Sequence, residues 1–440
     1  MLVNANEDDL LLKDNKNVKD KYHLVYFIVF FTGIGVLIPW NFFITAKQYF
    51  VFKLTDTGNS TASDLPYKFE NYLSIASMVP AAIINILNLV LRRYITPMRR
   101  FSVGISLMFL VFLVTLILTK VNTQKDIMSF FIITMISVVI LNTCSGIMQG
   151  SSLGVISMMP GRYIKGYMEG QAIGGLIASV ANILAIVAVS SPDSSAFIYF
   201  LVALIFLLIT GIGFCRLGKI KFSRSYVKIA NQMDNETEDE YPDIAFNTDS
   251  LPLSSIGNRQ SFMEKYAPLV KQIYWFGLTV TLEFVVTLSL FPAFSSQIVT
   301  QSNNENWKKF FTPVTCFLFF NIADYIGRYF CGILKFPSQN YPKTLFFIAL
   351  IRFIFVPLIF MCNIPTRTNF PIIFYNDAYP IVFTILLGLT NGYFITLSLI
   401  YAPSQVSDKE KEAVGTLMNL FLCFGLAFGV ALSFVYLYII

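Results

Sequence analysis

Long apolar runs alternate with short polar segments along almost the whole chain. A helix that crosses the hydrocarbon core of a bilayer needs about 20 mostly apolar residues. We predict eleven such spans, at residues 24–46, 71–91, 101–119, 128–155, 168–190, 195–215, 268–294, 310–333, 344–362, 378–402 and 414–439. The strands of a membrane barrel are shorter and alternate in polarity. The pattern therefore predicts an all-α membrane protein.

The spans form a group of six and a group of five, separated by a long polar segment. We expect a cytoplasmic tail at 1–23, a six-helix bundle at 24–215, a cytoplasmic linker at 216–266 and a five-helix bundle at 267–440. The linker begins basic, turns acidic and has no hydrophobic period, which is typical of disordered segments. Two bundles joined by a linker are typical of secondary transporters, whose substrate site lies between the halves.

The positions of the Lys and Arg residues orient the spans. If the N-terminus is cytoplasmic, 21 of the 32 lie in cytoplasmic segments and 8 in external segments, as the positive-inside rule requires. We therefore expect a cytoplasmic N-terminus and an extracellular C-terminus. The glycosylation sequon at Asn59 then lies outside, whereas the sequon at Asn235 lies inside and should stay unmodified.

Composition agrees with this class and excludes others. Charged residues make up only 13% of the 440 residues, about half the share in soluble domains. The single histidine, His23, argues against a His-based metal site or catalytic triad. The six cysteines show no CxxC spacing. We expect no metal, no cofactor and no enzymatic activity. The net charge of +6 does not indicate nucleic acid, because the basic residues flank spans.

Polar side chains inside a membrane span cost free energy and need a reason. In the first span, Leu37, Trp40, Asn41 and Ile44 share one helical face. The ring of Trp40 could contact a planar ligand, while the amide of Asn41 offers donors and an acceptor. An interfacial Trp beside a helix-capping Asn is the structural alternative.

The fourth span carries a second polar face, made of Ser145, Gln149 and Ser152. The amide of Gln149 donates and accepts at once, which suits the edge of a nucleobase. Hydrogen bonding between helices is the structural alternative, and it contributes only about 0.6 kcal/mol per bond.

The strongest candidate site lies in the eighth span, where Asn321, Asp324 and Arg328 share a face. A charge at the bilayer centre costs about 2.5–3.5 kcal/mol or more, and pairing reduces that cost. A carboxylate accepts hydrogen bonds from hydroxyls and a guanidinium donates in a planar fork, so the pair suits a vicinal diol. We expect the pair to face a water-filled pocket. A structural ion pair between helices is the alternative.

A lone acid, Glu283, lies in the seventh span. Proton coupling is the functional interpretation, and an unidentified local partner is the structural one. Lys271 is too far along the helix to pair with it directly, and Arg352 is expected to snorkel or to pair. Elsewhere, small residues four apart predict close helix contacts, at Gly170 with Gly174, Gly175 with Ser179 and Gly425 with Gly429.

Several motifs occur in order from about Tyr22 to the C-terminus. They are Pro39-Trp40-Asn41-Phe42-Phe43, Gln149-Gly150-Ser151, Gly170-Gln171 with Gly175, Phe291-Pro292-Ala293, Phe320-Asn321-Ile322 with Asp324 and Gly327-Arg328, and Asn391-Gly392-Tyr393. Together they resemble the equilibrative nucleoside transporter family. The resemblance implies a fold of the major facilitator type with one helix fewer, and alternating access. It also implies sodium-independent, facilitated movement of purine and pyrimidine nucleosides such as adenosine and uridine.

The resemblance also implies roles for individual residues. Trp40 and Met78 would pack on the ligand, Gln149 would read the base, and Asp324 with Arg328 would hold the ribose hydroxyls. The remaining implied positions are Leu37, Asn41, Phe291 and Asn321 in the cavity, Ile44 and Pro292 near the outer gate, and the packing glycines Gly170 and Gly175. Ser145, Ala81 and Glu283 depart from the residues usual in the family.

Two alternatives stay open from the sequence. One is a proton-coupled nucleoside or nucleobase carrier that uses Glu283, and the other, from a different class, is a channel or a ligand-sensing receptor. We expect a monomer in the plasma membrane. The segment Glu7-Asp8-Asp9-Leu10-Leu11-Leu12 fits an acidic dileucine sorting pattern, which indicates endosomes or lysosomes as the alternative location.

Overall fold

A computed structural model describes residues 19–45, 47–55, 65–91, 94–121, 126–188, 192–226, 262–365 and 370–437. Asn59, the segment 7–12 and the central part of the expected linker, 227–261, lie outside these described residues.

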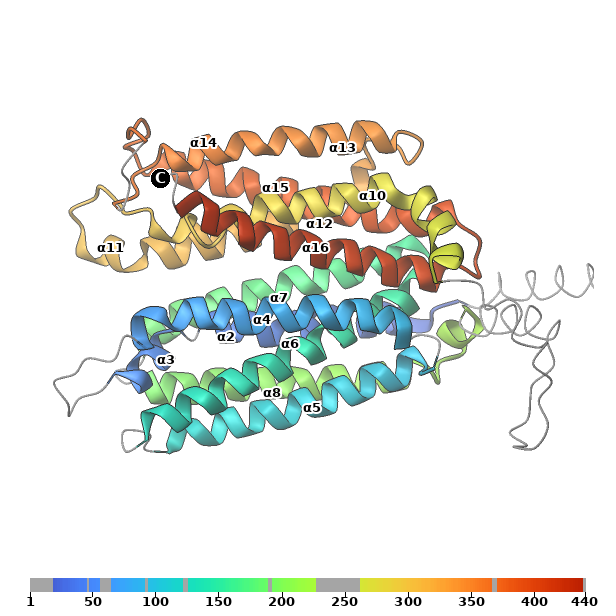
Figure 1. The fold of residues 1–440 in the computed structure, drawn as a ribbon, viewed down its shortest axis with the longest axis horizontal. Coiled ribbons are helices and arrows are strands. Elements are labelled where there is room, and N and C mark those ends of the chain that lie inside the picture. Colours follow the sequence, from blue (N-terminus) through green and yellow to red (C-terminus); the bar gives the residue numbers. More distant parts are fainter. Residues whose placement is uncertain are drawn as a thin grey trace, which may run out of the picture.

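The helices run along one common axis and form two groups (Figure 1). The first group comprises α2 (Leu24–Thr45), α3 (Lys47–Leu54), α4 (Leu65–Leu91), α5 (Pro97–Lys120), α6 (Ile127–Ser157), α7 (Gly161–Ala188) and α8 (Pro192–Leu217). The second comprises α10 (Phe262–Leu290), α11 (Glu305–Thr312), the π-helical η4 (Pro313–Leu318), α12 (Phe319–Leu334), α13 (Pro342–Ile351), η5 (Arg352–Ile354), α14 (Phe355–Phe360), α15 (Ala378–Tyr401) and α16 (Lys411–Leu437). Short 3₁₀ turns at 21–23, 295–297 and 402–405 complete the order.

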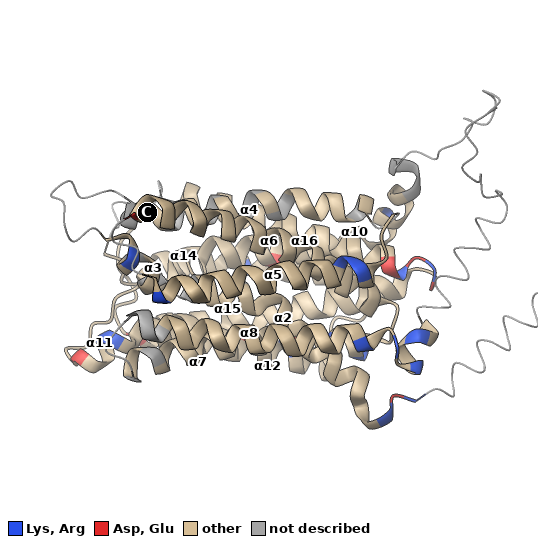
Figure 2. Ribbon diagram, turned by 90° about the horizontal axis from the view of Figure 1, so that it is seen from below, with Lys and Arg blue, Asp and Glu red and all other residues tan. Residues whose placement is uncertain are grey.

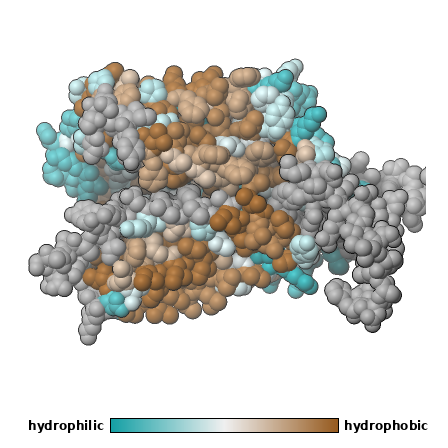
Figure 3. All heavy atoms as spheres, viewed as in Figure 1, coloured by the Kyte–Doolittle hydropathy of each residue, from teal (hydrophilic) through white to brown (hydrophobic). Residues whose placement is uncertain are grey.

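The surface of the bundle matches a membrane protein. Apolar residues cover the middle of the molecule and polar residues lie at its two ends (Figure 3). Within the described part of the chain, nine helices are long and apolar enough to cross a bilayer. Helices α4 and α7, with 27 and 28 residues, lie alongside them. The mostly helical architecture is confirmed, while the count of eleven spans stays a prediction.

Basic residues are concentrated at one end of the bundle. Figure 2 shows Lys and Arg gathered most densely where α5 begins and α8 ends. The opposite end, which includes α3 and α11, carries fewer of them. The Lys and Arg residues are therefore distributed unevenly between the two ends, as their positions in the sequence indicated.

Glycines allow two pairs of helices to cross in close contact. A Cβ atom on Gly170 would lie 2.0 Å from the carbonyl oxygen of Phe30, and one on Gly33 would lie 2.0 Å from that of Tyr167. The crossing of α2 and α7 is therefore reciprocal. The same arrangement joins α12 and α15, where a Cβ on Gly392 would lie 2.0 Å from the carbonyl oxygen of Asp324. Close helix approach through small residues is the usual basis of association in lipid.

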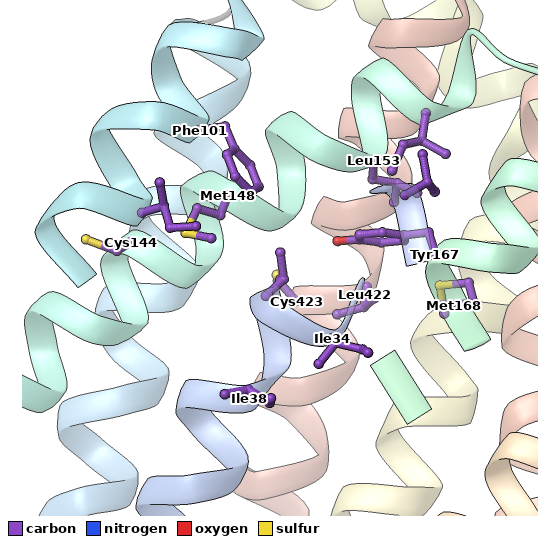
Figure 4. Packing of buried hydrophobic residues seen from close by; sticks show 14 of the residues in the cluster. Ile34, Ile38, Phe101, Cys144, Met148, Leu153, Tyr167, Met168, Leu422 and Cys423 are labelled. Atoms are coloured by element: carbon purple, nitrogen blue, oxygen red, sulfur yellow. The ribbon is translucent and has the colours of Figure 1, made fainter. Parts of the chain in front are cut away.

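Two apolar clusters fill the interior. The larger cluster joins both groups of helices, since Leu422 and Cys423 of α16 lie among Met148 of α6 and Tyr167 of α7 (Figure 4). The smaller cluster lies within the second group and includes Phe294, Phe320, Phe360 and Tyr436. The two groups are thus packed directly against each other at α6 and α16.

Ordered structure extends into both ends of the segment expected as the linker, 216–266. After α8, residues 221–226 are helical, and the ring of Phe222 lies 5.3 Å from that of Tyr163. Helix α10 already begins at Phe262. Aromatic packing on the start of α7 explains the first extension, because it supplies apolar contacts that the charge pattern did not reveal.

We predict that Gly170→Ala lowers the melting temperature of the detergent-purified protein. The added methyl group forces α2 and α7 apart, and overpacking of this kind costs about 1–3 kcal/mol. Gly213→Ala in α8 is the matched control, because its Cβ would meet the Ile28 side chain at an ordinary 3.6 Å. Equal melting temperatures for the two variants would contradict the close crossing.

Candidate functional site

The acid and base predicted in the eighth span form an ion pair on α12. Arg328 Nε donates to Asp324 Oδ2 at 2.7 Å, across one helical turn. The two residues are only 3% and 5% exposed. The pair therefore satisfies each charge with the other inside the region that lacks water.

Arg328 also connects α12 with α7 in the other group of helices. Its Nη1 atom donates to the carbonyl oxygen of Met168 at 2.8 Å and to Gln171 Oε1 at 3.4 Å. Gln171 is itself buried. The guanidinium thus lies at the contact between the two groups.

Asp324 is held from the opposite side by α15. Asn391 Nδ2 donates to Asp324 Oδ1 at 2.7 Å, and Asn391 Oδ1 accepts a hydrogen bond from Thr287 of α10 at 2.8 Å. Among the described residues, each carboxylate oxygen therefore accepts one hydrogen bond from the protein. A carboxylate offers about four lone-pair sites, so about two remain for a ligand.

The polar face of α6 is linked to the same region through α7. Gln149 is buried. One turn further along α6, the hydroxyl group of Ser152 lies 2.9 Å from the hydroxyl group of Tyr167 on α7. Tyr167 lies one position before Met168, whose carbonyl oxygen accepts from Arg328. The second and third predicted clusters are thus brought together by a helix that lies between them.

Phe291, which directly follows α10, and Asn321 of α12 lie at the same turn of α12. The ring of Phe291 stacks on Phe320 with centroids 3.9 Å apart, and Asn321 Nδ2 donates to Ser179 Oγ of α7 at 2.9 Å. A Cβ on Gly175 would lie 2.2 Å from Asn321 Oδ1, so this glycine makes room for the amide.

The predicted face of α2 is described only in part. Leu37 and Asn41 are half-buried, as is Pro292 after α10. The side chains of Trp40, Ile44 and Met78 lie outside the described residues. Ser145 of α6 donates to the carbonyl oxygen of Val36 at 3.2 Å, which ties α6 to this part of α2.

The expectation of a water-filled pocket at the pair is not met in this conformation, because α7 and α15 enclose both side chains. A cavity of about 640 Å³ lies elsewhere, between α5 and α8, with Phe109, Leu207 and Gly211 among its lining residues. The glycine contact of α15 with α12 explains the enclosure, since it brings the two backbones together beside Asp324.

Sequence reasoning missed two polar partners and one ion pair. Gln171 and Asn391 lie inside motifs that the sequence singled out, but no role was given to their side chains. Glu283 is paired with Arg352 of η5, which is 69 positions away in the chain. Helical spacing reveals partners on the same helix only, so this pair had no signal in the sequence. No group of three or more His, Cys, Asp or Glu side chains that could hold a metal occurs in the described ranges.

Comparison with known proteins decides the family. The family model described as nucleoside transporter matches residues 135–438. Human equilibrative nucleoside transporter 2 is 32% identical over 448 residues, covering 95% of this chain and 98% of that protein. The chain belongs to the equilibrative nucleoside transporter family. Human equilibrative nucleoside transporter 1 is 33% identical with the same coverage. Rat equilibrative nucleoside transporter 3 is 32% identical over 94% of this chain and 88% of the relative.

Solved structures support the fold expected for an equilibrative nucleoside transporter. The E. coli fucose:proton symporter FucP matches with a TM-score of 0.50 and 8% identity, over 96% of this chain and 99% of the symporter. A structure of the major facilitator superfamily transporter FucP in the outward conformation gives 0.51 and 11% identity, over 94% and 97% of the chains. The major-facilitator-like fold and a transport function, rather than an enzymatic one, are confirmed.

We predict that Asp324→Asn lowers the melting temperature more than the double variant Asp324→Asn with Arg328→Gln. The single change leaves a buried guanidinium without its counter-charge, which costs about 3–5 kcal/mol, whereas the double change removes both charges. Thermal unfolding of the purified variants measures the difference. A double variant that melts at or below the single variant would show that the pair does not balance its charges internally.

Proposed function

We propose that this protein is a facilitative nucleoside carrier in which Asp324 and Arg328 bind the ribose of the substrate. The observation that carries the proposal is the position of the pair. It is buried at the contact between the two groups of helices and hydrogen-bonded to both α7 and α15. The relatives described above are named as equilibrative nucleoside transporters, and their names supply the substrate class.

The chemistry of the pair suits a ribose diol. About two lone-pair sites on Asp324 are left to accept hydrogen bonds from adjacent hydroxyl groups. Within the described ranges, the hydrogen bonds of Arg328 engage Nε and Nη1, so Nη2 supplies further donors.

The other roles follow the family pattern. Gln149, which Ser152 and Tyr167 link to the pair, is proposed to read the base, and Trp40 and Met78 to pack on the ligand. The remaining proposed positions are Leu37, Asn41, Phe291 and Asn321 around the cavity, Ile44 and Pro292 at the outer gate, and Gly170 and Gly175 as packing positions.

Transport requires that the enclosed pair becomes accessible from each side in turn. We propose that the bundles 24–215 and 267–440 move relative to each other while the segment 216–266 joins them. The contact of Arg328 with Met168 and Gln171 would break and reform in each cycle. A solute that binds both conformations crosses in either direction, down its own gradient and without a coupled ion.

The second candidate is proton-coupled transport through Glu283. The observation that favours it is a fully buried carboxylate oxygen, Oε1, with no hydrogen-bond partner among the described residues. The other oxygen pairs with Arg352. A carboxylate already neutralised by a guanidinium has little need of a proton, so we favour the passive carrier.

We further propose a monomer in the plasma membrane with its basic end in the cytoplasm. Transport of adenosine and uridine belongs to the same proposal.

For the orientation, we predict that Asn59→Gln removes a glycan and that Asn235→Gln, the matched control, removes none. Only an external sequon meets the glycosylation machinery. The measurement is the gel shift after enzymatic deglycosylation; a glycan lost on Asn235→Gln alone would reverse the orientation.

For the transport function, we predict that the double variant Asp324→Asn with Arg328→Gln reduces uridine uptake at least about tenfold. This corresponds to about 1.4 kcal/mol of lost binding free energy, less than a single charged hydrogen bond supplies. Uptake is measured in transporter-deficient cells and divided by surface expression. The expected uptake by the unaltered protein is saturable and stimulated by unlabelled nucleoside on the other side.

A matched control changes another ion pair in the same way. Glu305 and Lys308 form an exposed pair on α11 at 2.8 Å, and surface pairs contribute little. Glu305→Gln with Lys308→Gln should therefore transport normally. Near-normal uptake by the Asp324 and Arg328 double variant would overturn the ribose assignment. Uptake that rises with an inward proton gradient would favour proton coupling, and single-channel currents would favour a channel.

A further inference from the structure

A second buried acid and base pair lies in the same group of helices, outside the proposed ribose site. Glu283 in α10 is fully buried and Arg352 in η5 is 3% exposed. Arg352 Nη1 donates to the Glu283 carboxylate and to the Glu283 main-chain carbonyl, the latter at 3.1 Å. The guanidinium is therefore held by Glu283 through both side chain and backbone.

A chain of hydrogen bonds leads from Arg352 to Asp324 through two neutral side chains. Arg352 Nη2 donates to Thr287 Oγ1 at 2.9 Å. The Thr287 hydroxyl donates to Asn391 Oδ1 at 2.8 Å, and Asn391 Nδ2 donates to Asp324 Oδ1 at 2.7 Å. Every bond in the chain has its donor on the Arg352 side and its acceptor on the Asp324 side.

Both ends of this chain fix its direction. The Thr287 oxygen accepts from Arg352, which has no acceptor to offer, so the single hydrogen of the hydroxyl is directed at Asn391 Oδ1. The Asp324 carboxylate favours the same orientation of Asn391, because the amide oxygen turned toward it would be repelled. The position of Asn391, and with it the hydrogen bond that holds Asp324 Oδ1, thus depends on Thr287 and Arg352 as well as on Asp324.

Glu283 balances the charge of Arg352, which would otherwise attract the carboxylate of Asp324. A guanidinium stays charged even when buried, so it needs a carboxylate nearby. Among the described residues, Asp324 is the other carboxylate that interacts electrostatically with Arg352. Without Glu283, Asp324 would have to balance both Arg328 and Arg352.

We propose that Glu283 is a positioning residue for ribose recognition. By neutralising Arg352, it maintains the hydrogen bonds through Thr287 and Asn391 that orient Asp324. The inference rests on the proposed binding of the ribose diol by Asp324. It assigns to Glu283 a role in specificity, because a disoriented Asp324 weakens the binding of substrates that carry the diol and leaves other substrates unaffected.

The test compares uridine with dideoxyuridine, which lacks both hydroxyls of the diol. Thr287→Val breaks the chain with little change in shape and none in charge, and Glu283→Gln removes the counter-charge. Each variant should raise the KM for uridine about tenfold, the equivalent of one hydrogen bond to a charged group. Each should leave the KM for dideoxyuridine unchanged to within about twofold. Both are measured by uptake into transporter-deficient cells, normalised to surface expression.

Thr390→Val is the matched control. The Thr390 hydroxyl also accepts from Arg352, at 2.9 Å from Nε, but it lies off the path to Asp324. This variant should keep the preference of the unaltered protein for uridine. If Thr287→Val keeps that preference too, or loses uptake of both substrates equally, the positioning role is overturned while the ribose site stands. If the unaltered protein does not prefer uridine over dideoxyuridine, the ribose assignment is wrong and this inference falls with it.

Discussion

A guanidinium buried between helices needs a counter-charge and hydrogen-bond partners close by, and Arg328 sets this requirement for the site. Its partners come from α7 and from its own helix, and the partner of its counter-ion comes from α15. Two ion pairs among the described residues, each of one acid and one base, lie in this interior region. Their charges cancel, and the cost of each is reduced by hydrogen bonds as well as by pairing.

Much of the architecture could be read from the chain. Runs of apolar residues gave the helices, and helical spacing brought Asp324 and Arg328 together on one face, as the 2.7 Å contact confirms. The small-residue pairs at Gly170 and Gly425 mark real crossings, because backbone or side-chain atoms of the facing helices lie where their Cβ atoms would be. These features were predictable because each depends on residues within two turns of one another.

The unpredictable features all depend on contacts between distant segments. Nothing in the spacing along α10 indicated that Glu283 would meet Arg352 or that Thr287 would stand between Arg352 and Asn391. The enclosure of Asp324 had the same origin, since it results from the crossing of α12 and α15 rather than from any local pattern. The span expected at 310–333 is also divided, with a π-helical turn at Pro313–Leu318 that comes directly before α12. The apolar run in the sequence continues through these residues, so it gave no sign of the π-helical turn.

The contact of Arg328 with Met168 has a consequence for how this protein can change over generations. The acceptor is a main-chain oxygen, which every amino acid carries, so no replacement at position 168 deletes it. Gln171 is different, because its acceptor is part of a side chain. Of these two contacts between the halves, only the one at position 171 can be removed by a change of side chain.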